Sequence, residues 1–292
     1  MSHIVKHPLL HCKRGVGKVK FPMKKKERLV NKIRRLIRQA GLPRQLHRFG
    51  PKKFLLWQLC LGLLIKEIFR LSYRRAMKFL DEFYGIKLHW TTLQKFRKRV
   101  PLAIWQTLLK CTVSNSIAVA AIDGTSMQRH NPSMHYLKRI DRENKISVPI
   151  YLNVAVDVIR RKFIAIRHHA TKAGEISDVP YLIKQSPEEI ELVVLDKLYD
   201  SESLHRYFRE RGTYSIVPVK KNWAKGQYRK QLRDCFDYCL YWQRNLIESL
   251  FSALKRLFGN HLRGLTARTQ RAEIYCRLIA YNLGAIVIEI FY

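Results

Sequence analysis

The sequence predicts an α/β domain with a mixed sheet and flanking helices, preceded by a basic helical region that resembles a helix-turn-helix. Three observations support this fold class. From about residue 114, β-rich apolar runs alternate with capped amphipathic segments in the order β-β-β-α-β-α-β-α, which is typical of a mixed sheet with helices outside it. Residues 54–110 have helical spacing and helix-end signals. Lysine and arginine number 56 against 22 acidic residues, a formal net charge of +34.

Charge is the property that most restricts the function. A surface this basic favours a polyanionic partner, and nucleic acid is the usual one. An anionic membrane is the rival partner, but the longest apolar runs, 54–65 and 278–292, are shorter than the ~18 to 20 residues that a span needs. No apolar signal core follows the positive N-terminus. We therefore expect double-stranded DNA as the partner, no membrane association, and a cytoplasmic, nucleoid-associated location.

Residues 1–53 form the first of three expected parts, a basic N-terminal segment. It contains 17 Lys or Arg and a single acid, Glu27. Four apolar residues have helical spacing before a stop signal at Gly41: Leu29, Ile33, Leu36 and Ile37. We expect a basic amphipathic helix behind a loose leader.

Cysteine and histidine spacing gives little support for a metal site. The six cysteines form no CxxC pair, and we interpret them as reduced thiols. Cys235 and Cys239 could share a helix face, but two ligands make a poor zinc site, so core packing is expected. His3, His7 and His11 lie four residues apart beside Cys12, although Pro8 breaks the helix that would align them.

Residues 54–113 form the second part, a helical DNA-binding region. Helices are predicted over 54–69, over 71–85 between Ser72 and Gly85, and from the Thr91–Thr92 caps to Pro101. The last helix carries four basic residues: Lys95, Arg97, Lys98 and Arg99. Two short helices with a basic second one resemble a helix-turn-helix, so these four residues are candidate DNA contacts. The alternative is an ordinary helical bundle with a solvated basic face.

Residues 114–292 form the third part, which we expect to be catalytic. Strands are predicted at 117–127, 146–158, 162–170, 190–200 and 213–222, and helices at 176–186 and 201–212. Two buried strands each lead to an acid, Asp123 in "AAIDGTS" and Asp196 in "VVLDKLYD". Ligand sites of open α/β sheets form at such strand ends, and the carboxylates converge if the strands are neighbours. Either acid alone could be a solvated strand-end residue, but two in so acid-poor a chain favour a site.

A third acid lies in the helix predicted over 241–259. At 100° per residue, four polar residues fall within a stripe of about 60° along the edge of the apolar face. These residues are Tyr241, Arg244, Glu248 and Lys255. A simple Arg244–Glu248 ion pair, contributing about 0.3–0.5 kcal/mol, would explain that pair. It would not explain the acids on the two strands.

This four-residue spacing resembles the Tyr-Arg-Glu-Lys signature of DDE transposases from prokaryotic insertion sequences, in the group called IS-four and IS-five. "DGT" at Asp123 resembles the first aspartate motif of that family, and "DKLYDS" at Asp196 resembles the second, with Leu198 in place of a small residue. The resemblance spans about residues 117–290. Asp200 is a rival for the second acid, while Asp157 and Asp178 are expected to be surface or cap residues.

The resemblance implies an RNase H-like catalytic domain. It implies Mg²⁺-dependent cleavage at insertion-sequence ends, with Mn²⁺ able to substitute, and transfer of the freed 3′-OH into target DNA, in a synaptic homodimer. Three acids would be the catalytic metal ligands: Asp123, which would bridge two ions, Asp196 and Glu248. Carboxylate oxygens suit Mg²⁺, and two such cations stabilise both the attacking and the leaving oxygen. Tyr241, Arg244 and Lys255 would bind DNA phosphates. Two alternatives share these residues: a nuclease of the same fold without strand transfer, and an inactive domesticated DNA-binding relative.

Overall fold

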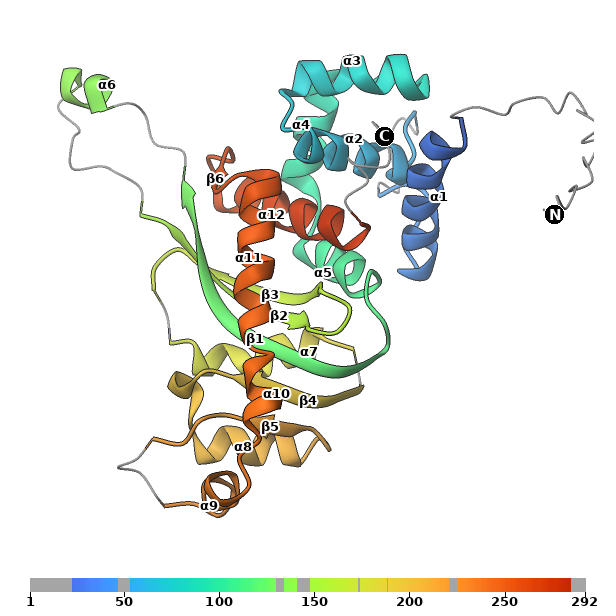
Figure 1. Cartoon of the computed structure of the whole chain (residues 1–292). Coiled ribbons are helices and arrows are strands. Elements are labelled where there is room, and N and C mark those ends of the chain that lie inside the picture. The colour runs from blue at the N-terminus through green and yellow to red at the C-terminus, as the bar shows by residue number, and fades with distance from the viewer. Residues whose placement is uncertain are drawn as a thin grey trace, which may run out of the picture.

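The computed structural model of the chain describes residues 23–46, 53–129, 134–140, 148–172, 174–187, 189–220 and 225–284. In Figure 1 a group of helices lies at one end of the molecule, a twisted sheet occupies the middle, and α8 (Glu202–Arg209) and α9 (Gln227–Asp234) lie at the other end. Within the described residues, no helix combines the length and the apolar character that a membrane span requires. The leader, including His3, His7, His11 and Cys12, lies outside the described residues.

The sheet has the mixed topology that the sequence predicts. Its strands are β1 (Ser116–Arg129), β2 (Ile150–Asp157), β3 (Lys162–His169), β4 (Glu189–Leu195), β5 (Tyr214–Ile216) and β6 (His261–Leu262). Their spatial order is β3-β2-β1-β4-β5, and β6 pairs with the far end of β1. β2 is antiparallel to β1 and to β3, whereas β4 is parallel to both β1 and β5. With helices on both faces, this is an RNase H-like fold.

Alternating side chains of β1 bind the two helical layers to the sheet. Val119 and Ala121 belong to the cluster that includes α11 (Asn245–Phe258) and α12 (Ala267–Asn282). Ala120 and Ile122 face the opposite cluster, beneath α7 (Val179–Gln185) and α8 (Glu202–Arg209). This period of two explains why a strand buried on both faces contains an almost unbroken apolar run.

The helical region precedes the sheet. It comprises α1 (Met23–Gln39), α2 (Leu56–Ile68), α3 (Tyr73–Tyr84), α4 (Trp90–Arg99) and α5 (Leu102–Lys110). The four apolar residues predicted for α1 are buried. The Ser72 hydroxyl accepts a hydrogen bond from the Arg75 N–H and begins α3, and Gly85 ends that helix at φ 65°. At α4 the cap is His89 rather than the predicted threonines.

One hydrophobic cluster joins this region to the sheet. It runs from Leu29 in α1 through α2 and Val154 in β2 to Ile279 in α12. In Figure 1 α12 lies between the helical group and the sheet. The domain boundaries at 53/54 and 113/114 remain predictions, and this hydrophobic cluster contains residues from both sides of each boundary.

A buried ion network forms the polar part of the same junction. The Glu273 carboxylate is fully buried and accepts hydrogen bonds from Arg97 Nη2 and Arg277 Nη2, both at 2.6 Å. The backbone N–H groups of Arg263 and Gly264 donate to it as well. Arg97 is therefore buried against α12, and the prediction of Arg97 as an exposed DNA contact is corrected. Its neighbours on α4, Lys95, Lys98 and Arg99, are exposed.

Three further expectations need correction. The helix predicted over 241–259 is divided into α10 (Tyr238–Trp242) and α11, because Gln243 and Arg244 form a tighter turn between them. In that turn the N–H of Ile247 donates to the Arg244 carbonyl, an i to i+3 bond. The strand predicted over 213–222 is short, since Pro218 cannot donate to a ladder. Cys235 and Cys239 are exposed, free thiols rather than core residues.

Candidate active site

The register of two parallel strands brings the two strand-end aspartates together. Ile122 of β1 pairs with Leu195 of β4, so Asp123 is the next residue of β1 and Asp196 directly follows the end of the neighbouring strand. Neighbouring strands lie about 4.8 Å apart. Each aspartate side chain also accepts a hydrogen bond from the following backbone N–H, Gly124 for Asp123 and Lys197 for Asp196, both at 2.8 Å.

Arg244 joins these aspartates to Glu248. Its Nη2 atom lies 2.9 Å from Asp123 Oδ2 and 4.0 Å from Asp196 Oδ2, and its Nη1 atom lies 3.3 Å from Glu248 Oε1. The tight turn before α11 carries this side chain toward the sheet edge. One guanidinium therefore contacts carboxylates from β1, β4 and α11. The predicted i, i+4 ion pair exists, but it is one of three contacts.

The three carboxylates differ in exposure. The side chain of Asp123 is 16% exposed and that of Asp196 is 31% exposed, whereas that of Glu248 is 61% exposed. Burial raises the pKa of the Asp123 carboxyl, and the charges of Asp196 and Glu175 raise it further. The Gly124 N–H and Arg244 oppose this rise in pKa. The carboxylates of Asp123, Asp196 and Glu248 thus lie around one guanidinium, whose positive charge offsets the repulsion between them.

Two cavities lie beside the carboxylates, one next to Asp196 and one next to Gly124. The first, of about 640 Å³, is lined by Asp196, Lys197, Lys220 and Tyr241 among others. Burial, and then the charge of Asp196, raise the pKa of the Tyr241 hydroxyl. The second, of about 310 Å³, is lined by Lys255 together with Thr125 and Ser126. Partial burial lowers the pKa of the Lys255 ammonium.

The residues present suit a divalent cation by their donor chemistry. Asp123, Asp196 and Glu248 offer only carboxylate oxygens, which Mg²⁺, Mn²⁺ and Ca²⁺ prefer. In this conformation the guanidinium of Arg244 supplies the positive charge among them. Within the described residues, no three His, Cys, Asp or Glu side chains are close enough together to hold a metal ion. The carboxylates would therefore have to draw together around the cation.

The family follows from a sequence comparison over the same region. A family model described as "Transposase DDE domain" matches residues 114–283, more than half of the chain. The chain belongs to this family. No curated protein matches it. Among solved structures, a piggyBac transposase synaptic complex with hairpin DNA matches with 11% identity and a TM-score of 0.45, covering 93% of this chain and 76% of that one.

Asp200, the rival for the second acid of this DDE transposase family member, is engaged elsewhere. Its carboxylate is buried and accepts hydrogen bonds from Arg229 Nε at 2.7 Å, Arg229 Nη2 at 2.8 Å and the Lys220 N–H at 2.9 Å. These bonds fix the loop after β4 to α9 (Gln227–Asp234). Asp196, in contrast, is partly exposed beside Asp123, so the geometry favours Asp196.

Asp157 and Asp178 were expected to be surface or cap residues, and both are fully buried. Asp178 does stand at the N-cap position of α7, although its side chain makes no capping hydrogen bond there. Asp157 accepts a hydrogen bond from the Arg160 N–H at 2.8 Å and closes the turn after β2. Asp178 lies 2.6 Å from His169 Nε2 and 3.1 Å from Arg167 Nε, and so ties α7 to β3. Both are paired structural acids.

Glu175 is a site residue that the sequence reasoning missed. A Cβ atom added at Gly124 would lie 3.0 Å from Glu175 Oε1, so this carboxylate lies against the backbone directly after Asp123. The buried hydroxyl of Tyr199 is close enough for the charge of Glu175 to raise its pKa, after the larger effect of burial. That hydroxyl has no partner of hydrogen-bonding geometry among the described residues. No motif marks Glu175, which precedes a short 3₁₀ turn between β3 and α7.

Proposed function

We propose that this protein is a DNA transposase that cleaves DNA strands at insertion-sequence ends and transfers the freed 3′-OH into target DNA. The observation that carries the proposal is the contact of one guanidinium with the three carboxylates of Asp123, Asp196 and Glu248. It supports a common site for acids that lie far apart in the sequence. Membership in the insertion-sequence group with the Tyr-Arg-Glu-Lys signature belongs to the same proposal.

In this proposal Asp123, Asp196 and Glu248 hold divalent cations, Mg²⁺ or Mn²⁺. When bound, two such cations stabilise the attacking and leaving oxygens of an in-line displacement at phosphorus. The strand register and the N–H groups of Gly124 and Lys197 hold the Asp123 and Asp196 carboxylates in position. Water is the first nucleophile, and the 3′-OH that it frees is the second.

Arg244 has two partners in this proposal, the carboxylates and a DNA phosphate. Its Nε atom is buried without an acceptor among the described residues, so the guanidinium has donor capacity left. A guanidinium can bind a phosphate through two parallel hydrogen bonds. Arrival of DNA would then draw Arg244 away from the acids and leave them free for cations.

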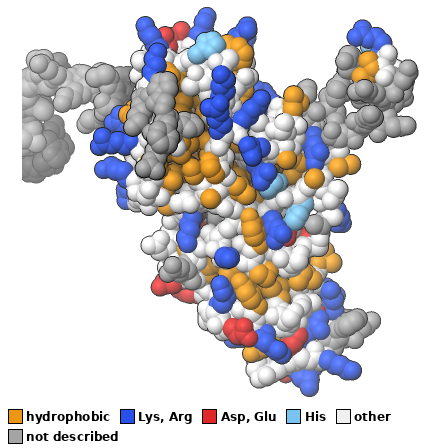
Figure 2. Space-filling model, turned by 180° about the vertical axis from the view of Figure 1, so that it is seen from behind, with side chains coloured by type: hydrophobic (Ala, Val, Ile, Leu, Met, Phe, Trp, Pro, Cys, Tyr) orange, Lys and Arg blue, Asp and Glu red, His pale blue; other side chains and the backbone are white. Residues whose placement is uncertain are grey.

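The DNA path proposed here crosses the carboxylates from the Tyr241 cavity to the Lys255 cavity. Figure 2 supports a polyanionic partner, because Lys and Arg side chains are spread over the face that it shows while acidic ones are few. Exposed Lys95, Lys98 and Arg99 on α4 would contact phosphates of the element end. A homodimer would hold two ends together, and the site of action would be the nucleoid.

The test uses DNA that flanks the reading frame, placed on a linear donor, with supercoiled plasmid as target and Mg²⁺ present. The expected products are nicked donor and joined donor–target DNA. Asp123→Asn should abolish both products while DNA binding is retained, because the basic surface is unchanged. Glu191→Gln, an exposed acid on β4, is the matched control and should act normally.

Each other outcome points to a specific alternative. Cleavage that depends on Asp123 but never yields joined DNA would identify a nuclease without strand transfer. DNA binding with neither product would identify an inactive relative. Normal cleavage by Asp123→Asn would refute the assignment of the metal ligands.

A further inference from the structure

A cavity of about 490 Å³ lies in the helical region, between α1 and the start of α2. Its walls are set by backbone bonds. Gly41, at φ 61°, turns the chain at the end of α1, and the N–H groups of Gly41 and Leu42 donate to the Arg38 and Ile37 carbonyls. This is the Schellman arrangement of a helix end. The Leu56 N–H then donates to the Arg44 carbonyl at 2.7 Å and fixes Arg44 beside the start of α2. The cavity is therefore built into the backbone.

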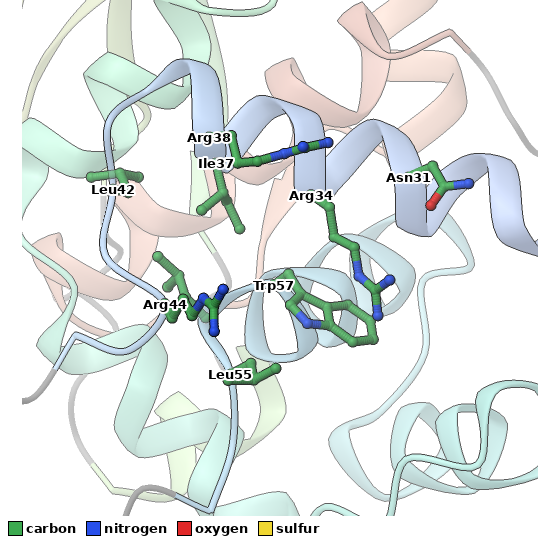
Figure 3. Close-up of a pocket in the computed structure, with 9 residues that line it drawn as sticks. Asn31, Arg34, Ile37, Arg38, Leu42, Arg44, Leu55 and Trp57 are labelled. Carbon is green, nitrogen blue, oxygen red and sulfur yellow. The ribbon is translucent and has the colours of Figure 1, made fainter.

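Three guanidinium groups surround this cavity. Arg34 and Arg38 come from α1 and Arg44 from the loop, and all three are exposed. Figure 3 shows Arg34 extending from α1 to the ring of Trp57, while Arg44 lies on the other side of the opening. No acidic residue is among the described residues that line the cavity, and no ion pair of these arginines occurs among the described residues. Like charges gathered without a counterion favour binding of an anion.

The interior of the cavity differs from a plain phosphate site. It is lined by Ile37, Leu42, Leu55 and Leu56, and by the half-buried indole of Trp57. The guanidinium carbon of Arg34 lies over the indole ring, 4.2 Å from its centre, which is a cation–π contact. Indole rings and guanidinium planes are the groups on which unpaired bases stack. The apolar and aromatic interior of the cavity thus suits the base of a nucleotide, and the arginines at its rim suit the phosphate.

We propose that this cavity, here named the α1–α2 pocket, binds one unpaired nucleotide of a DNA strand, a site that rests on the proposed function because DNA is the partner. The base would enter against Trp57 and Arg34, and the flanking phosphates would contact Arg38 and Arg44. Paired bases of a duplex are not available for this contact, because a base must leave its stack to enter a pocket. The pocket therefore selects DNA that is distorted or unpaired at one position.

The test measures binding without any divalent cation, so it does not depend on cleavage. The probe is a short duplex with one unpaired 2-aminopurine, compared with the same duplex fully paired. We expect the full-length protein to bind the unpaired probe about tenfold or more tightly, and to quench its fluorescence on stacking. Trp57→Ala should remove the preference and the quenching, while Trp57→Phe, which retains an aromatic ring, should keep part of both.

Arginine variants on one helix give the matched comparison. Arg34→Gln should weaken binding of the unpaired probe more than binding of the paired one. Arg35→Gln removes the same charge from a neighbouring exposed residue outside the pocket, and should weaken both probes equally. Thermal melting of each variant separates loss of folding from loss of binding.

Three results would overturn the proposal. The first is equal affinity of the wild-type chain for both probes, and the second is an unchanged preference in folded Trp57→Ala. The third is competition by free dAMP at the concentration of the probe, which would make a free nucleotide the occupant. Failure of the catalytic assignment is a separate result, because Asp123→Asn should retain the preference for the unpaired probe.

Discussion

Replacement of Arg244 by glutamine should increase the affinity of the DNA-free protein for Mn²⁺. The reason is that the guanidinium and the cation compete for the same carboxylates. The contact with Asp123 at 2.9 Å is a hydrogen bond between charged groups that are both about one-sixth exposed. Such a bond contributes about 1.5–3 kcal/mol. The contact with Glu248 is with a mostly exposed side chain and adds about 0–1 kcal/mol.

A total of about 1.5–4 kcal/mol corresponds to an increase in Mn²⁺ affinity of about 12- to 700-fold. Isothermal titration calorimetry without DNA measures it directly. Arg211→Gln, an exposed arginine on another part of the surface, has the same change in net charge and should alter the affinity little. DNA cleavage by Arg244→Gln should nevertheless fall, because a phosphate contact is lost. Unchanged or weaker Mn²⁺ binding by Arg244→Gln would refute the competition.

Three further predictions concern the buried ion network around Glu273, the pH dependence of DNA cleavage, and the exposed basic residues of α4. Glu273→Gln should destabilise the protein by about 3–5 kcal/mol, because it leaves buried Arg97 and Arg277 without their counterion. Burial alone would raise the pKa of Glu273, but the charges of Arg277 and Arg97 lower that pKa overall. The stability that ionised Glu273 gives the folded protein is therefore present at pH values above the ordinary carboxyl pKa, and it is lost as the pH falls below that value. Calorimetry at neutral and acid pH should find this acid-side loss in the wild type and not in Glu273→Gln. Glu175→Gln removes a negative charge that raises the pKa of Asp123, so the acid side of the pH–rate profile for DNA cleavage should move to lower pH. Glu191→Gln is the control and should leave the profile in place. An unchanged profile for Glu175→Gln would contradict the prediction. Neutralising Lys95, Lys98 and Arg99 together should reduce the slope of log K against log salt by about 3, at about 0.9 per phosphate contact. Arg97→Gln is the control on the same helix and should lower stability instead of changing that slope.

The strands and helices were predictable because their signals are local. The run "IAVAAID" contains its own burial pattern, and so does "IELVVLD". The strand order that joins them is set by pairing across many residues, so the convergence of Asp123 and Asp196 was conditional on neighbouring strands. The parallel register of β1 with β4 fulfils that condition.

Arg97 illustrates a signal that the spacing contained. It lies four residues after Leu93 and three before Val100, both buried, so it belongs to the apolar face of α4. The positive charge of Arg97 suggested an exposed side chain, whereas its position in the apolar periodicity indicated a buried one. The partner that makes burial tolerable is Glu273, which lies 176 residues later in the chain. Nothing near Arg97 in the sequence reveals that partner.

Two other features had no readable signal. The break between α10 and α11 occurs at Gln243 and Arg244, with no glycine or proline to mark it. Glu175 contacts the site through a loop, and only the absence of a side chain at Gly124 gives its carboxylate room. Both depend on how distant segments pack, which periodicity does not describe.

The hydrophobic cluster shared by the helical region and α12 has a consequence for synthesis on the ribosome. The apolar faces of α2, α4 and α5 are covered by α12, whose residues follow α2 by nearly 200 positions. At about 5–20 residues per second, those faces wait about 10–40 s for their cover. During this interval the nascent protein exposes apolar surface that chaperones recognise. The helical region and the sheet would thus reach their folded form only after α12 has left the ribosome. A chain that is truncated before residue 267 would have neither region in working form.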